Sequence, residues 1–195
     1  QLQANCYLLV KDKECVLIDP ADDANFLLEE ISRQNLNLVA MLATHGHFDH
    51  VMAVGEIQLS LKVPLYIHNK DLFLIKRLKE TAQHFLGFEP YIISPSIIKF
   101  VPKGKFQISH FKFQIIPSPG HTPGGVNFYF RDEQVLFTGD TLFKEAIGRT
   151  DLSYSSKEEL IESLKKLFKL PVSTIVYPGH GESTLIGQEE ALYHF

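Results

Sequence analysis

The sequence is poor in cysteine and contains no long apolar segment. Its 195 residues include only two cysteines, and 23 acidic residues outnumber 19 basic ones. No run approaches the roughly 18 apolar residues that a membrane-spanning helix needs, and no signal segment is visible. The net charge of −4 argues against a nucleic-acid partner, because phosphate binding usually requires a basic surface. We therefore expect neither a membrane nor a nucleic-acid partner, and the oligomeric state stays open.

The two cysteines are not expected to form a disulfide. Residues 4–10 and 15–19 are predicted to pair as a hairpin. In this register Cys6 lies opposite Asp19 and not opposite Cys15. Reduced cysteines are typical of the cytoplasm, so we expect a cytoplasmic protein in which Cys6 is a packing residue.

Alternating strand-like and helix-like segments predict an α/β protein with a single domain over residues 1–195. Apolar runs of strand length alternate with segments of helical spacing. Strands are predicted at 4–10, 15–19, 38–43, 64–67, 112–117, 126–130, 134–139 and 173–178, and helices at 22–35, 51–62, 70–85 and 156–168. The Pro-rich stretch 93–104 is expected to be irregular. Short strands adjacent in the sequence indicate hairpins rather than one parallel sheet.

Residues 44–50, THGHFDH, place three histidines and one aspartate within seven positions. Three further polar residues, His121, Asp140 and His180, each follow an apolar strand. The ends of such strands meet at one edge of an α/β fold. Seven nitrogen and oxygen ligands suit two metal ions that share one carboxylate. We expect one site formed by His45, His47, Asp49, His50, His121, Asp140 and His180.

An isolated His-x-His or Gly-His pair would be weak evidence for a metal site, because solvated and core histidines are commoner than ligands. The joint pattern, with a dense cluster followed by three further ligand types after strands, predicts metal binding. Four other histidines lack this context, and we interpret them as surface or packing residues: His68, His84, His110 and His194.

The chain resembles the metallo-β-lactamase superfamily of hydrolases over essentially its whole length. The matching segments are, in chain order, NCYLLV, LIDP, THGHFDH, SPGHTPGG, FTGDTLF, GRTDL and YPGHGESTLIGQE. The resemblance implies a four-layer αββα sandwich with two divalent ions at one edge, expected to be zinc, with iron or manganese as alternatives. It implies a first metal at His45, His47 and His121, a second at Asp49, His50 and His180, and a bridging Asp140. GRTDL and PGHGESTLIGQE are most similar to the glyoxalase II group and its short relatives.

These ligands indicate hydrolysis without a protein nucleophile. Two divalent ions lower the pKa of a shared water from 15.7 towards about 7 and polarise the carbonyl under attack. Asp49 is predicted to be catalytic, because it would orient the resulting hydroxide while it ligates the second ion. The same chemistry suits esters, thioesters, lactams and phosphodiesters, so the ligands alone do not select a substrate.

Departures from the larger families favour a small acyl thioester as substrate. The chain ends 15 residues after His180, so we expect no C-terminal helical domain of the kind that contacts glutathione in glyoxalase II. Nuclease relatives usually carry a large late insertion, but Asp140 follows His121 by only 19 positions. Zinc β-lactamases usually have Cys at the bridging position and an export signal, whereas this sequence has Asp140 at that position and no visible signal segment. A glyoxalase II-like thioester hydrolase is therefore the leading hypothesis.

Two other functions stay open. The iron-dependent persulfide dioxygenases share this fold and the GRTD stretch, and in them two histidines and one aspartate hold a single iron. The matching residues are His45, His121 and Asp140. A metal-binding protein without catalysis is the third hypothesis, although structural zinc sites favour four closed ligands. The complete second ligand set favours two-metal hydrolysis over both.

Two residues near the ligands have alternative interpretations. Arg149 follows Asp140 by nine positions, in a Gly-containing loop. It either pairs with Asp151 to hold the loop or faces the cleft and binds a substrate carboxylate. A cationic residue binds glutathione at the matching place in glyoxalase II relatives, but Asp151 replaces its aromatic partner. Phe48 points either into the core or into the substrate pocket.

Overall fold

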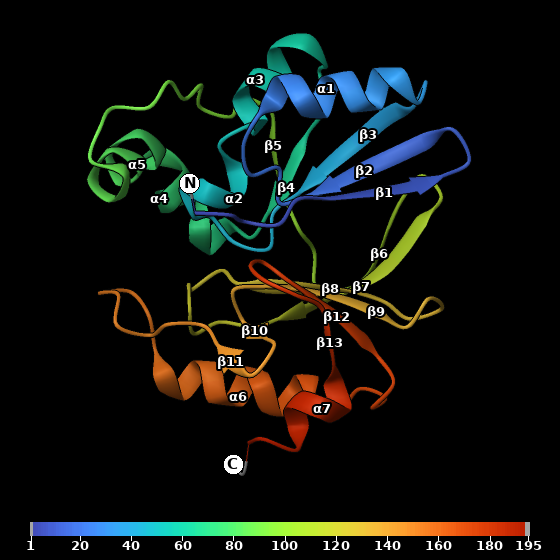
Figure 1. Ribbon diagram of the computed structural model, residues 1–195, viewed down its shortest axis with the longest axis vertical. Coiled ribbons are helices and arrows are strands. Elements are labelled where there is room, and N and C mark those ends of the chain that lie inside the picture. Colours follow the sequence, from blue (N-terminus) through green and yellow to red (C-terminus); the bar gives the residue numbers. More distant parts are fainter. Residues whose placement is uncertain (1, 194–195) are drawn as a thin grey trace.

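The computed structural model describes residues 2–193, which form four layers (Figure 1). Helices α1 (Ala24–Arg33) and α3 (Val54–Ser60) cover the outer face of one sheet, and α6 (Lys157–Leu167) and α7 (Ile186–Glu190) cover the outer face of the other. The two sheets pack face to face between these helices. The αββα sandwich expected from the sequence is therefore confirmed.

The first sheet combines one hairpin with a run of parallel strands. Its order is β1-β2-β3-β4-β5, with bounds β1 Tyr7–Lys11, β2 Glu14–Ile18, β3 Asn37–Leu42, β4 Leu65–Ile67 and β5 Ile98–Phe100. Strands β1 and β2 are antiparallel, and Val10 lies opposite Cys15, so that Cys6 does not face Cys15, as predicted. Both Cys6 and Cys15 are free thiols. Strand β5 is parallel to β4 and lies within the stretch predicted to be irregular. The sequence did not predict this edge strand, because three residues are too few to show a periodic pattern of apolar side chains.

The second sheet is mostly antiparallel, as adjacent short strands predicted. Its order is β13-β12-β9-β8-β7-β6, with bounds β6 Gly104–Ile108, β7 Phe111–Pro117, β8 Val126–Phe130, β9 Val135–Gly139, β12 Ile175–Pro178 and β13 Thr184–Leu185. Only β9 and β12 are parallel. A separate small hairpin contains β10 (Leu142–Phe143) and β11 (Ala146–Ile147).

Two predicted helices are interrupted. The segment predicted as one helix at 51–62 contains the end of α2 (Phe48–Val51) and all of α3. The segment at 70–85 divides into a 3-10 turn (Asn69–Asp71), α4 (Leu72–Lys76) and α5 (Leu78–Leu86). The second break is at Arg77, whose φ of −111° and ψ of 17° leave the α-helical region.

Three apolar cores hold the layers together. Side chains alternate along β2, so that Leu17 packs under α1 and α3, whereas Ile18 packs between the sheets. The central core is rich in aromatic rings, including Phe113 and Phe128. A third core joins the second sheet to α6 through residues such as Leu164. These layers form a rigid support for the loops at one end of the sheets.

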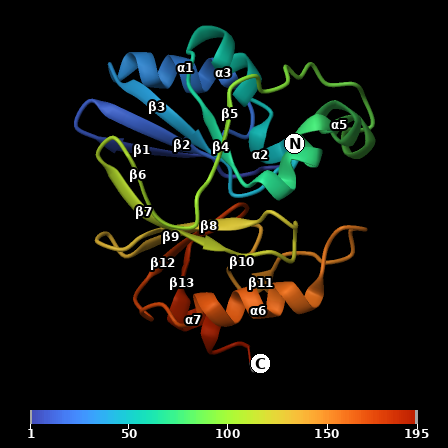
Figure 2. The ribbon, with the colours of Figure 1, turned by 180° about the vertical axis from the view of Figure 1, so that it is seen from behind.

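The loops that leave β3, β7, β9 and β12 gather at the end of the sandwich where α2 and α5 lie (Figures 1 and 2). The N-terminal segment reaches the same end, where Ala4 forms a β-bridge with His180. Among residues 2–193, no helix is long and apolar enough to cross a bilayer.

Candidate metal centre and adjoining cleft

Four loops bring all seven predicted residues to one place. The loop after β3 and the start of α2 carry the first four, and the loops after β7, β9 and β12 carry one each. The side chains form two groups, and within each group the candidate ligand atoms lie within 4.8 Å of one another. The groups are His45, His47, His121 and Asp140, and Asp49, His50 and His180. This division matches the two ligand sets that the sequence resemblance implies.

In the first group, three imidazole nitrogens converge. Nδ1 of His47 lies 3.0 Å from Nε2 of His45 and 3.0 Å from Nε2 of His121. Nδ1 of His121 donates to the carbonyl oxygen of Arg149 at 2.9 Å. Its Nε2 therefore presents a lone pair to the group, which is the form that binds a metal.

The second group lies directly beside the first. Nε2 of His50 is 3.3 Å from Nε2 of His180, and Nε2 of His180 is 3.4 Å from Oδ2 of Asp49. The two oxygens of Asp140 face different groups. Oδ2 is 3.5 Å from Nε2 of His121, whereas Oδ1 is 3.3 Å from Nε2 of His50. Asp140 thus has the placement expected of a bridging ligand.

The hydrogen bonds among the seven candidate ligands do not satisfy every buried polar atom of the site. Oδ1 of Asp140 is buried without a hydrogen-bond partner, which is costly for a carboxylate unless a cation compensates for it. The donor atoms are imidazole nitrogens and carboxylate oxygens, a set that suits zinc and iron. These residues therefore fit two divalent ions.

Electrostatics separates the two groups. Burial and the neighbouring imidazoles lower the pKa of His45, and burial and His121 lower that of His47 to about 3. Burial acts on His50 in the same direction, but the carboxylates of Asp140 and Asp19 raise its pKa well above the usual value. A hydrogen bond to Asp49 raises the pKa of His180. Hence the imidazoles of His45 and His47 are neutral at neutral pH, whereas His50 and His180 attract protons that a metal must displace.

Asp19 supports the second group and was not among the predicted site residues. It follows β2 and is buried, and its Oδ2 lies 3.1 Å from Nδ1 of His50. It also accepts hydrogen bonds from the backbone N and from Oγ1 of Thr44, each at 2.7 Å. The sequence carried a usable signal, because Asp19 follows a buried strand as the predicted ligands do.

Asp71, also buried, joins two ligand-bearing loops. Its carboxylate accepts hydrogen bonds from the backbone N of Gly46 at 3.0 Å, from Oγ1 of Thr122 at 2.7 Å and from the backbone N of Gly124 at 2.6 Å. Gly46 lies between His45 and His47, so Asp71 fixes the spacing of the loops. No sequence pattern singled it out.

Tyr154 contacts the first group from the far side of His47. Its hydroxyl lies 2.8 Å from Nε2 of His47, and its ring packs edge-on against Phe73 at a centroid distance of 5.3 Å. His47 and Tyr154 are 107 positions apart. No local pattern could have predicted this contact.

A cleft of about 220 Å³ opens onto both groups. Phe48 is 4% exposed and stacks on Phe85 at 6.0 Å, yet it also lines the cleft, so both interpretations of Phe48 hold. Asp49 lies in the cleft wall, as its predicted catalytic role requires. The full lining is Leu2, His47, Phe48, Asp49, Thr81, Phe85, His121, Asp140, Arg149, Leu152 and His180.

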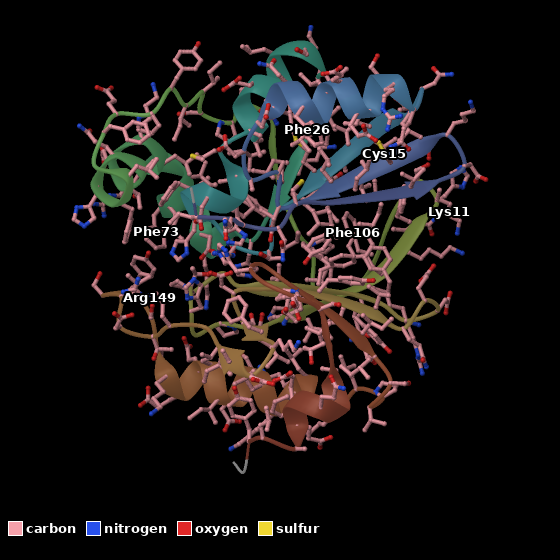
Figure 3. All side chains as sticks on the ribbon, viewed as in Figure 1. Lys11, Cys15, Phe26, Phe73, Phe106 and Arg149 are labelled. Atoms are coloured by element: carbon pink, nitrogen blue, oxygen red, sulfur yellow. The ribbon has the colours of Figure 1, made fainter. Side chains whose placement is uncertain are left out.

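Arg149 pairs with Asp151 and also lines the cleft. Its Nε and Nη2 donate to the two carboxylate oxygens of Asp151 at 2.6 and 2.7 Å. Both side chains are more than half exposed. Figure 3 shows Arg149 below Phe73, on the side of the molecule where α5 lies. The expected ion pair is therefore present, and the substrate role of Arg149 stays a prediction.

Of the histidines that the structure describes, His68, His84 and His110 lie outside both groups. Nδ1 of His68 accepts from the backbone N of Lys70 at the start of the 3-10 turn. His84 and His110 are exposed. His194 lies outside the described residues.

The fold and the paired His and Asp groups are those of a metallo-hydrolase. Residues 1–180 match the family model of the metallo-β-lactamase superfamily, and the chain belongs to that superfamily. It is 40% identical to hydroxyacylglutathione hydrolase GloC of Haemophilus influenzae, over 96% of this chain and 90% of the relative.

Two solved structures are similar to the chain over nearly its full length. TTHA1623, in a di-iron-bound form, has a TM-score of 0.89 and 38% identity, and the match covers 97% of this chain and 93% of that one. BLEG-1, a B3 metallo-β-lactamase, has a TM-score of 0.90 and 37% identity, with 97% and 92% covered. These relatives support a metallo-hydrolase with a His and Asp metal-binding cluster.

Proposed function

We propose that the protein hydrolyses a small acyl thioester and that its working form holds two divalent metal ions, with zinc expected and iron or manganese as alternatives. The observation that carries this proposal is the carboxylate of Asp140, whose two oxygens face two complete ligand groups. A site for a single ion would not require the second group formed by Asp49, His50 and His180.

Each residue has a defined part in this reaction. Two divalent ions, when bound, would supply a hydroxide at neutral pH and would polarise the carbonyl. Asp49, in the cleft wall, would orient this hydroxide while it ligates the second ion. Hydrolysis forms a bond between the acyl carbon and the hydroxide oxygen and breaks the bond between the acyl carbon and sulfur, and the sulfur leaves as a thiol after it gains the proton of the water. His45, His47 and His121 would hold one ion, and Asp49, His50 and His180 the other, with the carboxylate of Asp140 facing both groups.

The cleft favours a small acyl group. Its volume of about 220 Å³ is below the roughly 300–1,000 Å³ of pockets that enclose a drug-sized ligand. Leu2, Phe48, Phe85 and Leu152 form apolar walls, and Arg149, which also lines the cleft, would bind a substrate carboxylate. The name of the GloC relative, a hydroxyacylglutathione hydrolase, supports the same substrate class.

The test compares thioester cleavage with oxygen consumption. The purified protein is given S-lactoylglutathione under argon, and the loss of thioester absorbance is followed. In parallel, an oxygen electrode records its response to glutathione persulfide. We expect cleavage without oxygen uptake. Rapid oxygen uptake with no thioester cleavage would instead support the dioxygenase hypothesis. If the protein catalyses neither reaction, the result would support the hypothesis of metal binding without catalysis.

Lactam hydrolysis is a second candidate, favoured by the 37% identity to BLEG-1. The two-metal centre suits a lactam carbonyl as well as a thioester carbonyl. A chromogenic cephalosporin assayed beside S-lactoylglutathione separates the two activities. We expect the ratio of kcat to KM to be higher for the thioester.

A further inference from the structure

A cavity of about 570 Å³ lies on the second sheet, away from the metal centre. Its floor is the outer face of β6, β7 and β8. Lys105 pairs with Gln114, and Gln114 pairs with Tyr129, whose side chain belongs to the core that joins this sheet to α6. Strand β7 runs towards the loop of His121, and the cavity lies over its other end, on the side of β6 that is opposite α5 in Figure 1. None of the seven candidate ligands lines it.

Three exposed cations line this cavity: Lys105, Lys112 and Arg131. Within residues 2–193, none of them has an ion-pair partner. Asp132 is the one acidic residue in the lining. The cavity therefore has a positive potential, although the whole chain has a net charge of −4.

The strand register brings two of these cations together. Gln114 of β7 pairs with Tyr129 of the antiparallel strand β8. Lys112 lies two positions before the first of these residues, and Arg131 lies two positions after the second. Side chains two positions apart share one face of a strand, so Lys112 and Arg131 extend from neighbouring segments at the same end of the sheet. Like charges in such positions destabilise a sheet, and an anion bound between them would remove the repulsion.

The hydroxyl of Tyr129 gives a second, independent indication of a ligand. Tyr129 is only 3% exposed, and within residues 2–193 its hydroxyl has no hydrogen-bond partner. This oxygen is not among the fully enclosed atoms that lack a partner, so it opens into the cavity that Tyr129 lines. A hydroxyl on a buried side chain normally has a partner. The floor of the cavity thus offers a hydrogen-bond donor that no described residue uses.

Phosphoryl groups match this set of donors. A guanidinium binds phosphate oxygens in pairs, a lysine ammonium binds them as a point charge, and a tyrosine hydroxyl donates one hydrogen bond. A single carboxylate would neutralise only one of the three cations. The volume of about 570 Å³ lies within the roughly 300–1,000 Å³ of cavities that hold small molecules. The cavity therefore suits a small ligand with several negative charges.

We propose that this cavity binds the diphosphate group of a small phosphorylated molecule. Lys105, Lys112 and Arg131 hold the phosphoryl groups, and the hydroxyl of Tyr129 donates a hydrogen bond to one of their oxygens. The site lies outside the metal centre and its cleft. The inference therefore goes beyond the proposed function and does not depend on it.

Calorimetry with pyrophosphate, ADP and adenosine tests the proposal. Pyrophosphate and ADP should bind to the metal-loaded protein, whereas adenosine, which has no phosphoryl group, should not. Lys112→Gln and Arg131→Gln should each raise the Kd of ADP about threefold to fivefold, as expected for one exposed ionic contact. Tyr129→Phe should raise it about fivefold, the effect of one lost hydrogen bond. Melting temperatures confirm that the variants fold.

Two controls locate the binding. Lys79→Gln removes an exposed cation on α5 that does not line this cavity, and it should leave the Kd of ADP unchanged. Asp140→Ala alters the metal centre, where phosphate oxygens could ligate the ions, and ADP should still bind to this variant.

The proposal is overturned if neither pyrophosphate nor ADP binds, or if the folded Asp140→Ala variant no longer binds ADP. It is also overturned if Lys79→Gln weakens binding as much as Lys112→Gln does. Tighter binding of a short DNA strand than of ADP would contradict it as well, because the ligand would then be a nucleic acid and not a small molecule.

Discussion

The carboxylate of Asp19 lies 3.1 Å from Nδ1 of His50, and both side chains are almost completely buried. Asp19 thereby accepts the Nδ1 proton and directs Nε2 of His50 towards Asp140. A carboxylate behind a metal-binding imidazole both orients the ring and makes it a stronger ligand. Asp19 is therefore a positioning residue of the second ligand group.

Asp19→Asn should weaken metal binding about 10-fold to 100-fold, the range typical for loss of such a partner. The effect should be larger for the second ion, because Asp19 contacts His50 directly but reaches His45 only through Oγ1 of Thr44. Competition with a chromogenic chelator measures both affinities. Asp132→Asn, at an exposed turn, is the control, and an equal loss in both variants would show that position 19 has no special role.

Tyr154→Phe should weaken the ion held by the first group. The variant keeps the ring that packs on Phe73 but removes the hydroxyl 2.8 Å from Nε2 of His47. A loss of about 10-fold in metal affinity is expected, with the melting temperature of the metal-free protein nearly unchanged. Unaltered affinity together with a lower melting temperature would make Tyr154 a packing residue only.

Arg149→Ala should raise KM for thioesters with a carboxylate by about fivefold, and should leave neutral thioesters and metal content nearly unchanged. The reason is that Arg149 lines the cleft but is not among the metal-binding groups. Equal losses on charged and neutral thioesters, with a lowered melting temperature, would show that its pair with Asp151 only braces the loop.

Acidification should release the second ion before the first. The pKa values of His50 and His180 are raised, so protons compete for their nitrogens near neutral pH, whereas the pKa of His47 is lowered to about 3. Metal affinity of the second group therefore falls as the pH falls. Dialysis at pH 8 and at pH 6, followed by elemental analysis, should find two ions and then one.

His180→Ala controls for the assignment of the released ion. It should hold one ion at both pH values, because it already lacks the acid-sensitive group. If this variant loses its remaining ion at pH 6 as readily as the wild type loses its first, the two groups do not differ in proton competition.

The sequence predicted which residues gather, because the strands that precede them end at the same edge of the fold. Asp19 obeys the same rule and could have been included. Tyr154 and Asp71 could not, since their contacts join distant segments and leave no local pattern. The break at Arg77 was also missed, because apolar spacing continues across a single non-helical residue.

The two-metal account is tested most directly by titrating metal-stripped protein with zinc while thioester hydrolysis is measured. We predict that activity reaches its maximum at about two equivalents per chain. Asp140→Ala should bind neither ion tightly, because its carboxylate faces both groups. Full activity at one equivalent, with no further change up to two, would contradict the account.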